Sequence, residues 1–180
     1  MSQTDKTNHG IFLAILAAAL YAMNAPLSKI LLDYMPPMLM AGFLYIGAGA
    51  GMGIIALIRK LSKKDHFEAT LTKNELPYTI AMIVLDIIAP ICLLIGLRTT
   101  TAANASLLNN FEIVATAIIA LCVFKEAISP RLWLGIVFVT ASCMFLSVED
   151  LSSFRFSYGS LFILLASICW GFENNCTRKI

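Results

Sequence analysis

Charge is scarce in this chain of 180 residues, and the shortage excludes most soluble folds. Charged residues make up 13% of the sequence and hydrophobic residues 59%, with a mean hydropathy of +0.82. An ordinary soluble domain carries roughly a quarter charged residues. The sequence also lacks the HExxH, GxSxG and P-loop motifs of zinc proteases, serine hydrolases and nucleotide-binding enzymes. We therefore expect an integral membrane protein that is not an enzyme.

Metal-ligand spacing is missing as well. The five cysteines all lie inside apolar runs, and the two histidines stand alone in polar segments. Such an arrangement supports neither a disulfide framework nor a zinc site, so the sequence predicts no metal and no cofactor. The net charge of +2 does not indicate a nucleic-acid partner, because the basic residues follow membrane topology instead.

What the sequence has in abundance is apolar runs of about 20 residues, the length that a helix needs to cross the hydrocarbon core of a bilayer. These runs predict an all-α, polytopic transmembrane helical bundle. The expected helices are 10–32, 36–58, 76–97, 101–124, 129–147 and 158–180, with a polar tail at 1–9 and a polar loop at 148–157. The first run could also be a cleaved signal peptide, but a later copy of the same segment favours a retained helix.

The lysines and arginines give this bundle an orientation. With the N-terminus in the cytoplasm, only Lys29, Arg98 and Arg155 fall at the outer ends of helices. The other basic residues fall on the inside, which is the usual bias of membrane proteins. We therefore predict a cytoplasmic N-terminus and a location in the cytoplasmic membrane, with the lipid bilayer as a partner.

The first predicted helix occurs twice in the sequence. The segment 10–29, GIFLAILAAALYAMNAPLSK, is repeated at 159–178 as GSLFILLASICWGFENNCTR. The aligned pairs include Gly10 and Gly159, Ala17 and Ala166, Tyr21 and Trp170, Asn24 and Glu173, Ser28 and Thr177, and Lys29 and Arg178. Self-similarity at a fixed offset indicates a repeat architecture. Five helices lie between the copies, so the second copy crosses in the opposite direction, as in inverted-topology repeats. We predict that 10–147 is one five-helix repeat and that 158–180 begins a second.

Two acids lie deep within predicted helices. Asp86 is about 15 Å into the third helix, and Glu112 is about 16 Å into the fourth from the opposite side, at about 1.5 Å per residue. Ionisable groups at this depth are costly and usually face a cavity or a partner. We therefore expect both carboxyl groups near the midplane on adjacent helices. Asn109 and Asn110 precede Glu112 and could line the same cavity, or only pack helices.

Further candidates lie on the two copies of the repeated helix. Asn24 and Glu173 occupy matching depths, and Tyr21 and Trp170 lie about one turn before them. A substrate or proton site could use all four, with the aromatic rings as cavity walls. The simpler interpretation is that these side chains, like the two acids, only bond neighbouring helices and never meet a substrate.

Two prolines are expected to break their helices. Pro26 and Pro90 have no N–H, so the carbonyl groups of Ala22 and Asp86 lose their helical partners. Freed carbonyl groups beside buried carboxyl groups are typical of an ion or substrate site in a discontinuous membrane helix.

Residues 107–129, LLNNFEIVATAIIALCVFKEAIS, resemble the fourth helix and exit turn of the EamA-like family of the drug/metabolite transporter superfamily. Glu112 falls on the acidic position found in many members, and Glu126 and Ser129 fall on the Glu and Ser of the exit turn. The family's first-helix pattern is matched by Asn24, Pro26 and Lys29. The chain departs from the family at Ile113, where proline is common, at Tyr45, near a common arginine, and at Asn175, which replaces proline in the second copy.

The resemblance covers nearly the whole chain and implies a function. Similar proteins have ten helices in two five-helix repeats, and they export metabolites, amino acids or drugs, some of them against protons. We therefore predict a secondary transporter of a small molecule, completed by a second repeat of the same chain or by a homodimer partner. The alternatives are a small multidrug-type carrier that acts as a homodimer and a non-transporting membrane scaffold.

Overall fold

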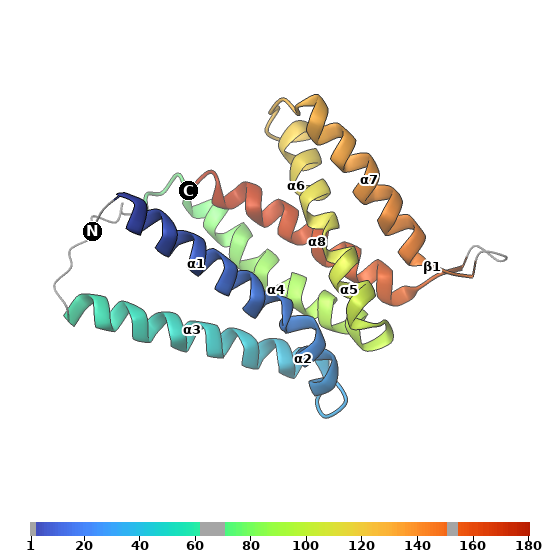
Figure 1. Ribbon diagram of the computed structural model, residues 1–180, viewed down its shortest axis with the longest axis horizontal. Coiled ribbons are helices and arrows are strands. Elements are labelled where there is room, and N and C mark those ends of the chain that lie inside the picture. Colours follow the sequence, from blue (N-terminus) through green and yellow to red (C-terminus); the bar gives the residue numbers. More distant parts are fainter. Residues whose placement is uncertain (1–2, 62–70, 151–154) are drawn as a thin grey trace.

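The computed structural model describes residues 3–61, 71–150 and 155–180 of the chain. These residues form helices and one two-stranded hairpin (Figure 1). In chain order the elements are α1 Gln3–Ala22, α2 Asn24–Leu31, α3 Pro37–Leu61, α4 Leu76–Thr99, α5 Ala102–Asn109, α6 Phe111–Cys122, α7 Pro130–Ser147, β1 Val148–Asp150, β2 Arg155–Phe156 and α8 Tyr158–Thr177.

Four of the described helical segments are long and apolar enough to cross a membrane. They are Gly10–Leu31, Pro37–Leu61, Leu76–Thr99 and Ala102–Cys122, and Pro130–Phe145 is a shorter apolar helix. These helices confirm the predicted all-α, polytopic transmembrane bundle. α8 does not qualify as a span, because Glu173, Asn174 and Asn175 lower the hydropathy of its second half.

The first helix begins earlier than expected, and the interruption within it is shorter than expected. α1 starts at Gln3, so it reaches into the segment for which a polar tail was predicted. A single residue, Met23, separates α1 from α2. Pro26 then lies in the first turn of α2, where its missing N–H has no helical acceptor to lose. The break predicted around Asn24 and Pro26 therefore falls just before both.

The predicted break at Pro90 is wrong, and a break occurs elsewhere. α4 runs continuously through Pro90, which is buried. Neighbouring helices can make proline tolerable within a membrane helix. The predicted helix 101–124 is instead interrupted at Asn110, whose side-chain amide donates to the carbonyl oxygens of Ser106 at 3.3 Å and Leu107 at 3.2 Å. An asparagine that bonds its own backbone in this way competes with the helix.

A short hairpin replaces part of the loop that was predicted at 148–157. β1 pairs with β2 in antiparallel register, with Val148 opposite Phe156 and Asp150 opposite Arg155. Val and Phe favour strands, but two or three residues are too few for a sequence pattern to stand out. The hairpin joins α7 to α8, at the end of the bundle opposite the two termini (Figure 1).

α8 lies at the centre of the bundle, between α4 and α6 (Figure 1). Its crossing with α4 is close because two glycines meet: a Cβ on Gly96 would lie 2.5 Å from the carbonyl oxygen of Gly159. Its crossing with α6 is equally tight, since a Cβ on Gly171 would lie 2.7 Å from the Cβ of Ala115. Small residues allow helices in membranes to approach in this way. The best-packed part of the bundle is therefore organised around α8.

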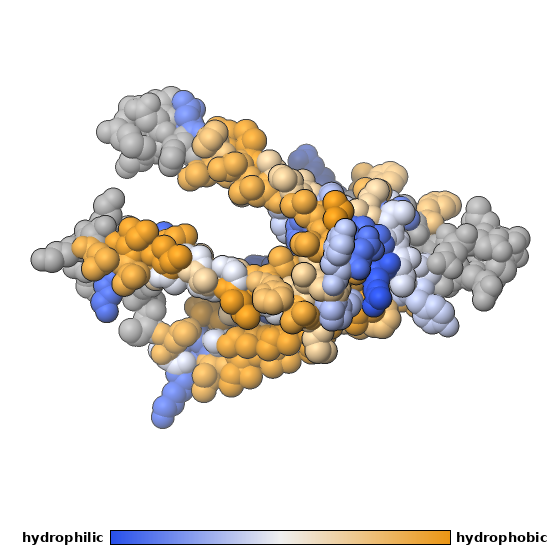
Figure 2. Space-filling view, turned by 90° about the horizontal axis from the view of Figure 1, so that it is seen from below, coloured by the Kyte–Doolittle hydropathy of each residue, from blue (hydrophilic) through white to orange (hydrophobic). Residues whose placement is uncertain are grey.

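The helices α1 and α3 are far more open. The apolar window of the span Gly10–Leu31 has 0% of its residues buried, against 33% for Leu76–Thr99. A Cβ added to the glycines of α3 would meet nothing within 4 Å. Figure 2 shows the result as two arms with apolar surface that flank an open space, at the end where Figure 1 places the N-terminus and the end of α3.

Candidate functional site

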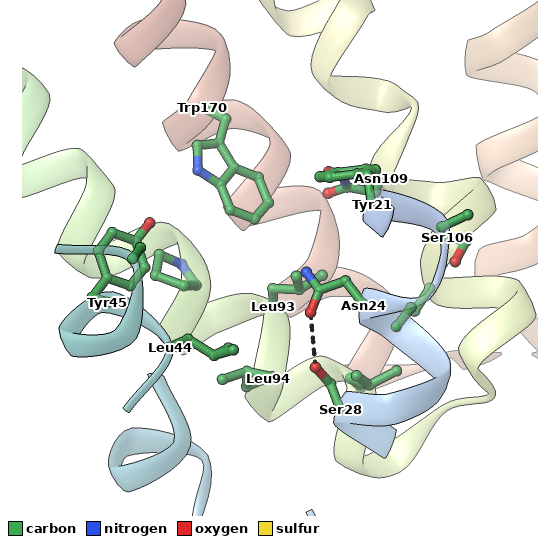
Figure 3. A pocket seen from close by; sticks show the side chains of 16 residues that line it. Tyr21, Asn24, Ser28, Leu44, Tyr45, Leu93, Leu94, Ser106, Asn109 and Trp170 are labelled. Atoms are coloured by element: carbon green, nitrogen blue, oxygen red, sulfur yellow. Dashed lines mark hydrogen bonds between the residues drawn. The ribbon is translucent and has the colours of Figure 1, made fainter. Parts of the chain in front are cut away.

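Six helices surround a cavity of about 580 Å³, which we call the central cavity. Residues of α1, α2, α3, α4, α5 and α8 line it (Figure 3). Its polar lining residues are Tyr21, Asn24, Ser28, Tyr45, Ser106, Asn109 and Trp170. The remaining wall is apolar and includes Leu44, Pro90, Leu93, Leu94 and Leu97. Among the described residues, those that line this cavity carry no charged side chain.

The two helix breaks meet at this cavity. Tyr21 and Asn24 flank the break at Met23, and Asn109 directly precedes the break at Asn110. The Asn109 Nδ2 atom donates a hydrogen bond to the Tyr21 hydroxyl oxygen at 3.1 Å, which joins the two helices. The other polar atom of this amide, Asn109 Oδ1, is buried and has no hydrogen-bond partner within the described part of the chain. At the wall of the cavity, Asn109 therefore holds a buried acceptor that has no partner among the described residues.

Aromatic side chains form the other side of the central cavity, and two acids lie near them. Trp170 and Tyr45 line it from α8 and α3 (Figure 3). The indole of Trp170 lies near the carboxyl group of Asp86 on α4. Tyr45 lies near the carboxyl groups of both Asp86 and Glu173. The carboxyl groups thus stand near the cavity without lining it.

A second, smaller cavity of about 370 Å³ lies between α6, α7, the turn that joins them, and α8. We call it the Glu112 cavity. Asn174 Nδ2 donates to Glu112 Oε1 at 2.8 Å and to Thr116 Oγ1 at 3.3 Å. At the margin, Arg178 Nη1 forms an ion pair of 2.7 Å with Glu126 Oε2. This cavity therefore differs from the central cavity in being lined by charged groups.

The repeated helix makes equivalent hydrogen bonds in its two copies. Ser28 Oγ donates to Asn24 Oδ1 at 3.0 Å, and at the matching positions Thr177 Oγ1 donates to Glu173 Oε1 at 2.6 Å. In each copy the next residue is basic and binds a neighbouring segment. Lys29 donates to carbonyl oxygens at the end of α4, where cations are favourable, while its counterpart Arg178 binds Glu126. The matched polar positions of the sequence repeat therefore make similar local hydrogen bonds.

The structure brings together only some of the candidates that the sequence singled out. Tyr21, Asn24, Asn109 and Trp170 share the central cavity. Glu112 lines the other cavity. Asp86 and Glu173 stand beside the central cavity, Pro90 lines it, Asn110 bonds its own helix, and Pro26 lies outside the lining of either cavity.

The expectation that the two deep acids lie together on adjacent helices is wrong. Asp86 is on α4 and Glu112 is on α6, but α8 lies between those helices. Each acid instead faces α8: Glu112 accepts a hydrogen bond from Asn174, and Asp86 lies near Trp170. One helical turn of α8 thus separates the surroundings of the two carboxyl groups.

Several residues of the two cavities were not predicted from the sequence. In the central cavity these are Ser28, Tyr45 and Ser106, and in the Glu112 cavity they are Thr116, Asn174 and Arg178. Ser28 had a usable signal, because it lies one turn after Asn24 and recurs as Thr177 in the repeat. Within the described residues, no group of three or more His, Cys, Asp or Glu side chains is placed to hold a metal ion.

Comparison with known proteins identifies the class of the chain. An uncharacterized transporter of Methanothermobacter thermautotrophicus is 27% identical over 176 residues, which is 91% of this chain and 51% of that protein. The uncharacterized transporter YyaM of Bacillus subtilis is 26% identical over 157 residues, 85% of this chain and 50% of its own length. The chain thus spans about half the length of these curated relatives. No solved structure shows a significant match.

The family model gives the same result over most of the chain. It covers residues 8–148, which include every helix from α1 to α7 except the first residues of α1. With apolar helices long enough to span a bilayer, the chain is an integral membrane protein, and it belongs to the EamA-like transporter family.

Proposed function

We propose that the protein is a secondary transporter, most simply an exporter, that binds a small organic molecule in the central cavity. A volume of about 580 Å³ is within the range of small-molecule sites, which are mostly apolar with a few polar groups that fix orientation. Two discontinuous helices supply several of those polar groups, as in many transporter sites. Membership of a transporter family supports the same function.

Asn109 is the observation that carries the proposal. Its Nδ2 atom is already bonded to Tyr21, whereas its Oδ1 atom is buried without a partner in the described residues. A buried acceptor without a hydrogen bond is costly, so the site gains from a ligand that brings a donor. We infer a substrate with an N–H or O–H group that reaches Asn109 Oδ1.

The rest of the cavity restricts the charge of that substrate. Its described lining contains no lysine or arginine that could neutralise an anion. Asp86 and Glu173 lie near its wall, and Trp170 and Tyr45 offer ring faces that attract cations. Amines, zwitterionic amino acids and neutral hydroxylated compounds therefore fit this cavity better than multiply charged anions do.

We also propose that Glu112 exchanges protons. A carboxyl group is the usual proton carrier within membranes, and Glu112 faces a cavity that is separate from the central cavity. Its hydrogen bond from Asn174 links it to α8, the helix that also supplies Trp170. A proton on Glu112 could therefore affect the central cavity through α8.

The orientation that we propose follows the basic residues. Arg59, Lys60, Lys125, Arg131 and Arg178 lie at one end of the bundle, which is also the end of both termini. The positive-inside bias then places this end in the cytoplasm of a cell whose cytoplasmic membrane holds the protein. We also propose that segment 59–75, of which residues 62–70 lie outside the described part of the chain, is cytoplasmic.

The proposal is tested by ligand binding to the purified protein. We would measure the thermal melting temperature with a panel of amino acids, amines, neutral hydroxylated compounds and carboxylates, because a ligand that binds only the folded state raises it. We expect stabilisation by donor-bearing compounds and weak or no response to multiply charged carboxylates. Proteoliposomes loaded with the stabilising compound would then report its flux.

The matched variants are Asn109→Ala and Asn74→Ala. Asn74 is exposed on the segment before α4 and lines neither cavity, so its substitution should leave both binding and flux unchanged. Asn109→Ala removes the free acceptor and should weaken binding by about tenfold, which corresponds to one lost hydrogen bond of about 1.4 kcal/mol. Equal binding by the two variants would contradict the assignment of the central cavity as the substrate site.

A further inference from the structure

The side chain of Asn24 lies at the wall of the central cavity, and a serine one turn away binds it. Ser28 Oγ donates a hydrogen bond to Asn24 Oδ1 at 3.0 Å (Figure 3). Asn24 is exposed, whereas Ser28 is only 3% exposed. The hydroxyl group therefore binds the amide from its buried side.

A buried serine in a helix usually has a simpler partner than an asparagine side chain. Its hydroxyl group can donate to the backbone carbonyl oxygen about one turn earlier. Ser167 on α8 does so: it is 0% exposed and donates to the carbonyl oxygen of Ile163 at 3.0 Å. Ser28 donates instead to the side chain of the residue at that spacing. Its hydrogen bond therefore acts on an exposed side chain at the cavity rather than on the backbone of its own helix.

This hydrogen bond decides which end of the Asn24 amide a ligand meets. An asparagine amide has an acceptor oxygen and a donor nitrogen. The torsion that exchanges them is broad and roughly two-fold, so the helix backbone does not select one orientation. Because Ser28 holds Oδ1, the Nδ2 atom lies on the side of the amide away from Ser28 (Figure 3). Asn24 therefore offers the cavity a donor.

The donor that Asn24 offers is uncharged, although a lysine lies nearby in the sequence. Lys29 Nζ donates to the carbonyl oxygens of Leu97 at 2.8 Å and Arg98 at 2.9 Å, and Lys29 does not line the central cavity. Among the described lining residues, an amide N–H is thus available to an acceptor, but no ammonium group is available to an anion. A neutral oxygen atom is the group that fits Asn24.

The repeated helix contains the same pair with the opposite chemistry. At the matched positions, Thr177 Oγ1 donates to Glu173 Oε1 at 2.6 Å. A hydroxyl group one turn later again holds one oxygen, but the other end of an ionised carboxylate is a second acceptor and not a donor. An acid in place of Asn24 should therefore turn the donor at this position into an acceptor.

We propose that Ser28 is a positioning residue that sets the specificity of the central cavity. It holds the Asn24 amide so that Nδ2 donates to a neutral oxygen atom of the substrate, such as a carbonyl oxygen. This inference rests on the proposed function, because it concerns the same cavity. It adds that the substrate carries an acceptor for Asn24 as well as a donor for Asn109.

Ligand-induced thermal stabilisation of the purified protein tests this role. The probes are benzylacetone, whose carbonyl oxygen is an acceptor, and butylbenzene, which has the same carbon skeleton without the oxygen. We expect the unmodified protein to bind the ketone about tenfold more tightly than the hydrocarbon, as one hydrogen bond allows. In Ser28→Ala the amide is free to turn, so this ratio should fall to about threefold or less. A ratio of two affinities cancels a general loss of stability, and comparison between variants cancels partitioning of the probes into detergent.

Three further variants separate positioning from other roles of Ser28. Ser28→Thr keeps the hydroxyl group and should retain the ratio, as should the control Ser167→Ala, which removes a buried hydroxyl group that lines neither cavity. In Asn24→Asp the preference for the ketone should disappear, because an ionised carboxylate only accepts. In an Asn24→Ala background, Ser28→Ala should have no further effect on the ratio, because Ser28 acts through Asn24.

The outcomes distinguish this inference from the proposed function. An unchanged ratio in Ser28→Ala, an equal fall in Ser167→Ala, or a further fall in the Asn24→Ala background would overturn the role of Ser28. Equal binding of ketone and hydrocarbon by the unmodified protein would also overturn it, although the central cavity would still bind ligands. If neither these probes nor any compound of the panel stabilises the protein, the proposed function itself fails.

Discussion

The two cavities differ in chemistry although one turn of α8 separates them. Trp170 lines the central cavity, and Asn174, one turn later, lines the Glu112 cavity. The central cavity lies towards the turn between α4 and α5, and its described polar groups are hydroxyl, amide and indole. The Glu112 cavity lies towards the turn between α6 and α7 and contains Glu112, Glu126 and Arg178. The uncharged polar groups and the charged groups therefore lie in two separate cavities, one turn of α8 apart.

This separation suggests a division of tasks with α8 as the common element. If substrate binds in one cavity and a proton in the other, the two ligands need not compete for a single carboxyl group. Coupling then requires an element that contacts both sites and has two arrangements. α8 contacts both sites, through Trp170 and Asn174. It also packs closely against α4 and α6. Substitutions on α8 and around it test this division directly.

The largest effect is expected at the crossing of α8 with α6, where both cavities would be disturbed together. In Gly171→Leu the new side chain has no space, because even a Cβ would lie 2.7 Å from Ala115 Cβ and 2.9 Å from Thr116 N. Overpacking of this kind typically costs 1–3 kcal/mol, so we expect a loss of about 3 kcal/mol or more of stability. Thermal melting in detergent measures it. The control Gly51→Leu, in open space on α3, should melt close to the unmodified protein; equal melting of both variants would show that this crossing is not tight.

The next effect separates the two cavities. Glu112→Gln keeps the shape of the side chain and an oxygen for the hydrogen bond from Asn174, but it cannot release a proton. We expect transport into proteoliposomes to lose its response to a pH gradient. The affinity of the central cavity for its ligand, read from thermal stabilisation, should change by less than about twofold. An unchanged pH response would leave Glu112 as a structural residue. A large loss of ligand affinity would mean that Glu112 itself contributes to substrate binding.

A smaller effect is expected for substitutions of Trp170, one turn of α8 before Asn174. Trp170→Ala removes an aromatic wall worth about 1 kcal/mol or slightly more, so ligand binding should weaken about five- to tenfold. Trp170→Phe keeps an aromatic ring but loses the indole N–H, which lies near Asp86. We expect Trp170→Phe to retain most of the affinity, as read by ligand-induced thermal stabilisation. If the two substitutions weaken binding equally, the indole N–H matters more for binding than the aromatic ring does.

The smallest effect is expected at the margin of the Glu112 cavity. The ion pair of Arg178 and Glu126 is exposed, with relative side-chain exposures of 60% and 38%. Pairs of this kind contribute at most about 1 kcal/mol and are screened by salt. Arg178→Ala should therefore lower the melting temperature only slightly, and the difference should shrink at high salt. A large, salt-independent loss would indicate that this pair holds the end of α8 in place.

Counting along the helices predicts a depth for each residue but not which residues face one another. Counting along helices placed Asp86 and Glu112 near mid-depth, yet it could not show that α8 would lie between them. The rotation of a helix about its axis and the order of helices in space depend on contacts between distant segments. Here these contacts are glycine crossings such as Gly96 with Gly159, for which the apolar sequence gives little signal.

Helix breaks show the same limit on a local scale. Pro90 predicted a break on chemical grounds, but the surrounding helices keep α4 continuous. Asn110 was considered only as a possible cavity residue, yet its amide bonds to the preceding turn and interrupts the helix. Whether a residue breaks a membrane helix depends on what replaces the lost backbone bonds. The repeat, by contrast, is a prediction from residue order alone and needs no contact between distant segments.

The crossing of α4 with α8 has a consequence for biosynthesis. Gly96 and Gly159 are separated by roughly sixty residues, which a ribosome that adds about 5–20 residues per second completes in several seconds. During that interval α4 must reside in the bilayer without the helix it will pack against. α4 is apolar enough to remain in lipid alone, because its mean hydropathy of 2.7 is the highest among the four described spans. The polar member of the pair is made last, when the surface that shelters Glu173, Asn174 and Asn175 is already in the membrane.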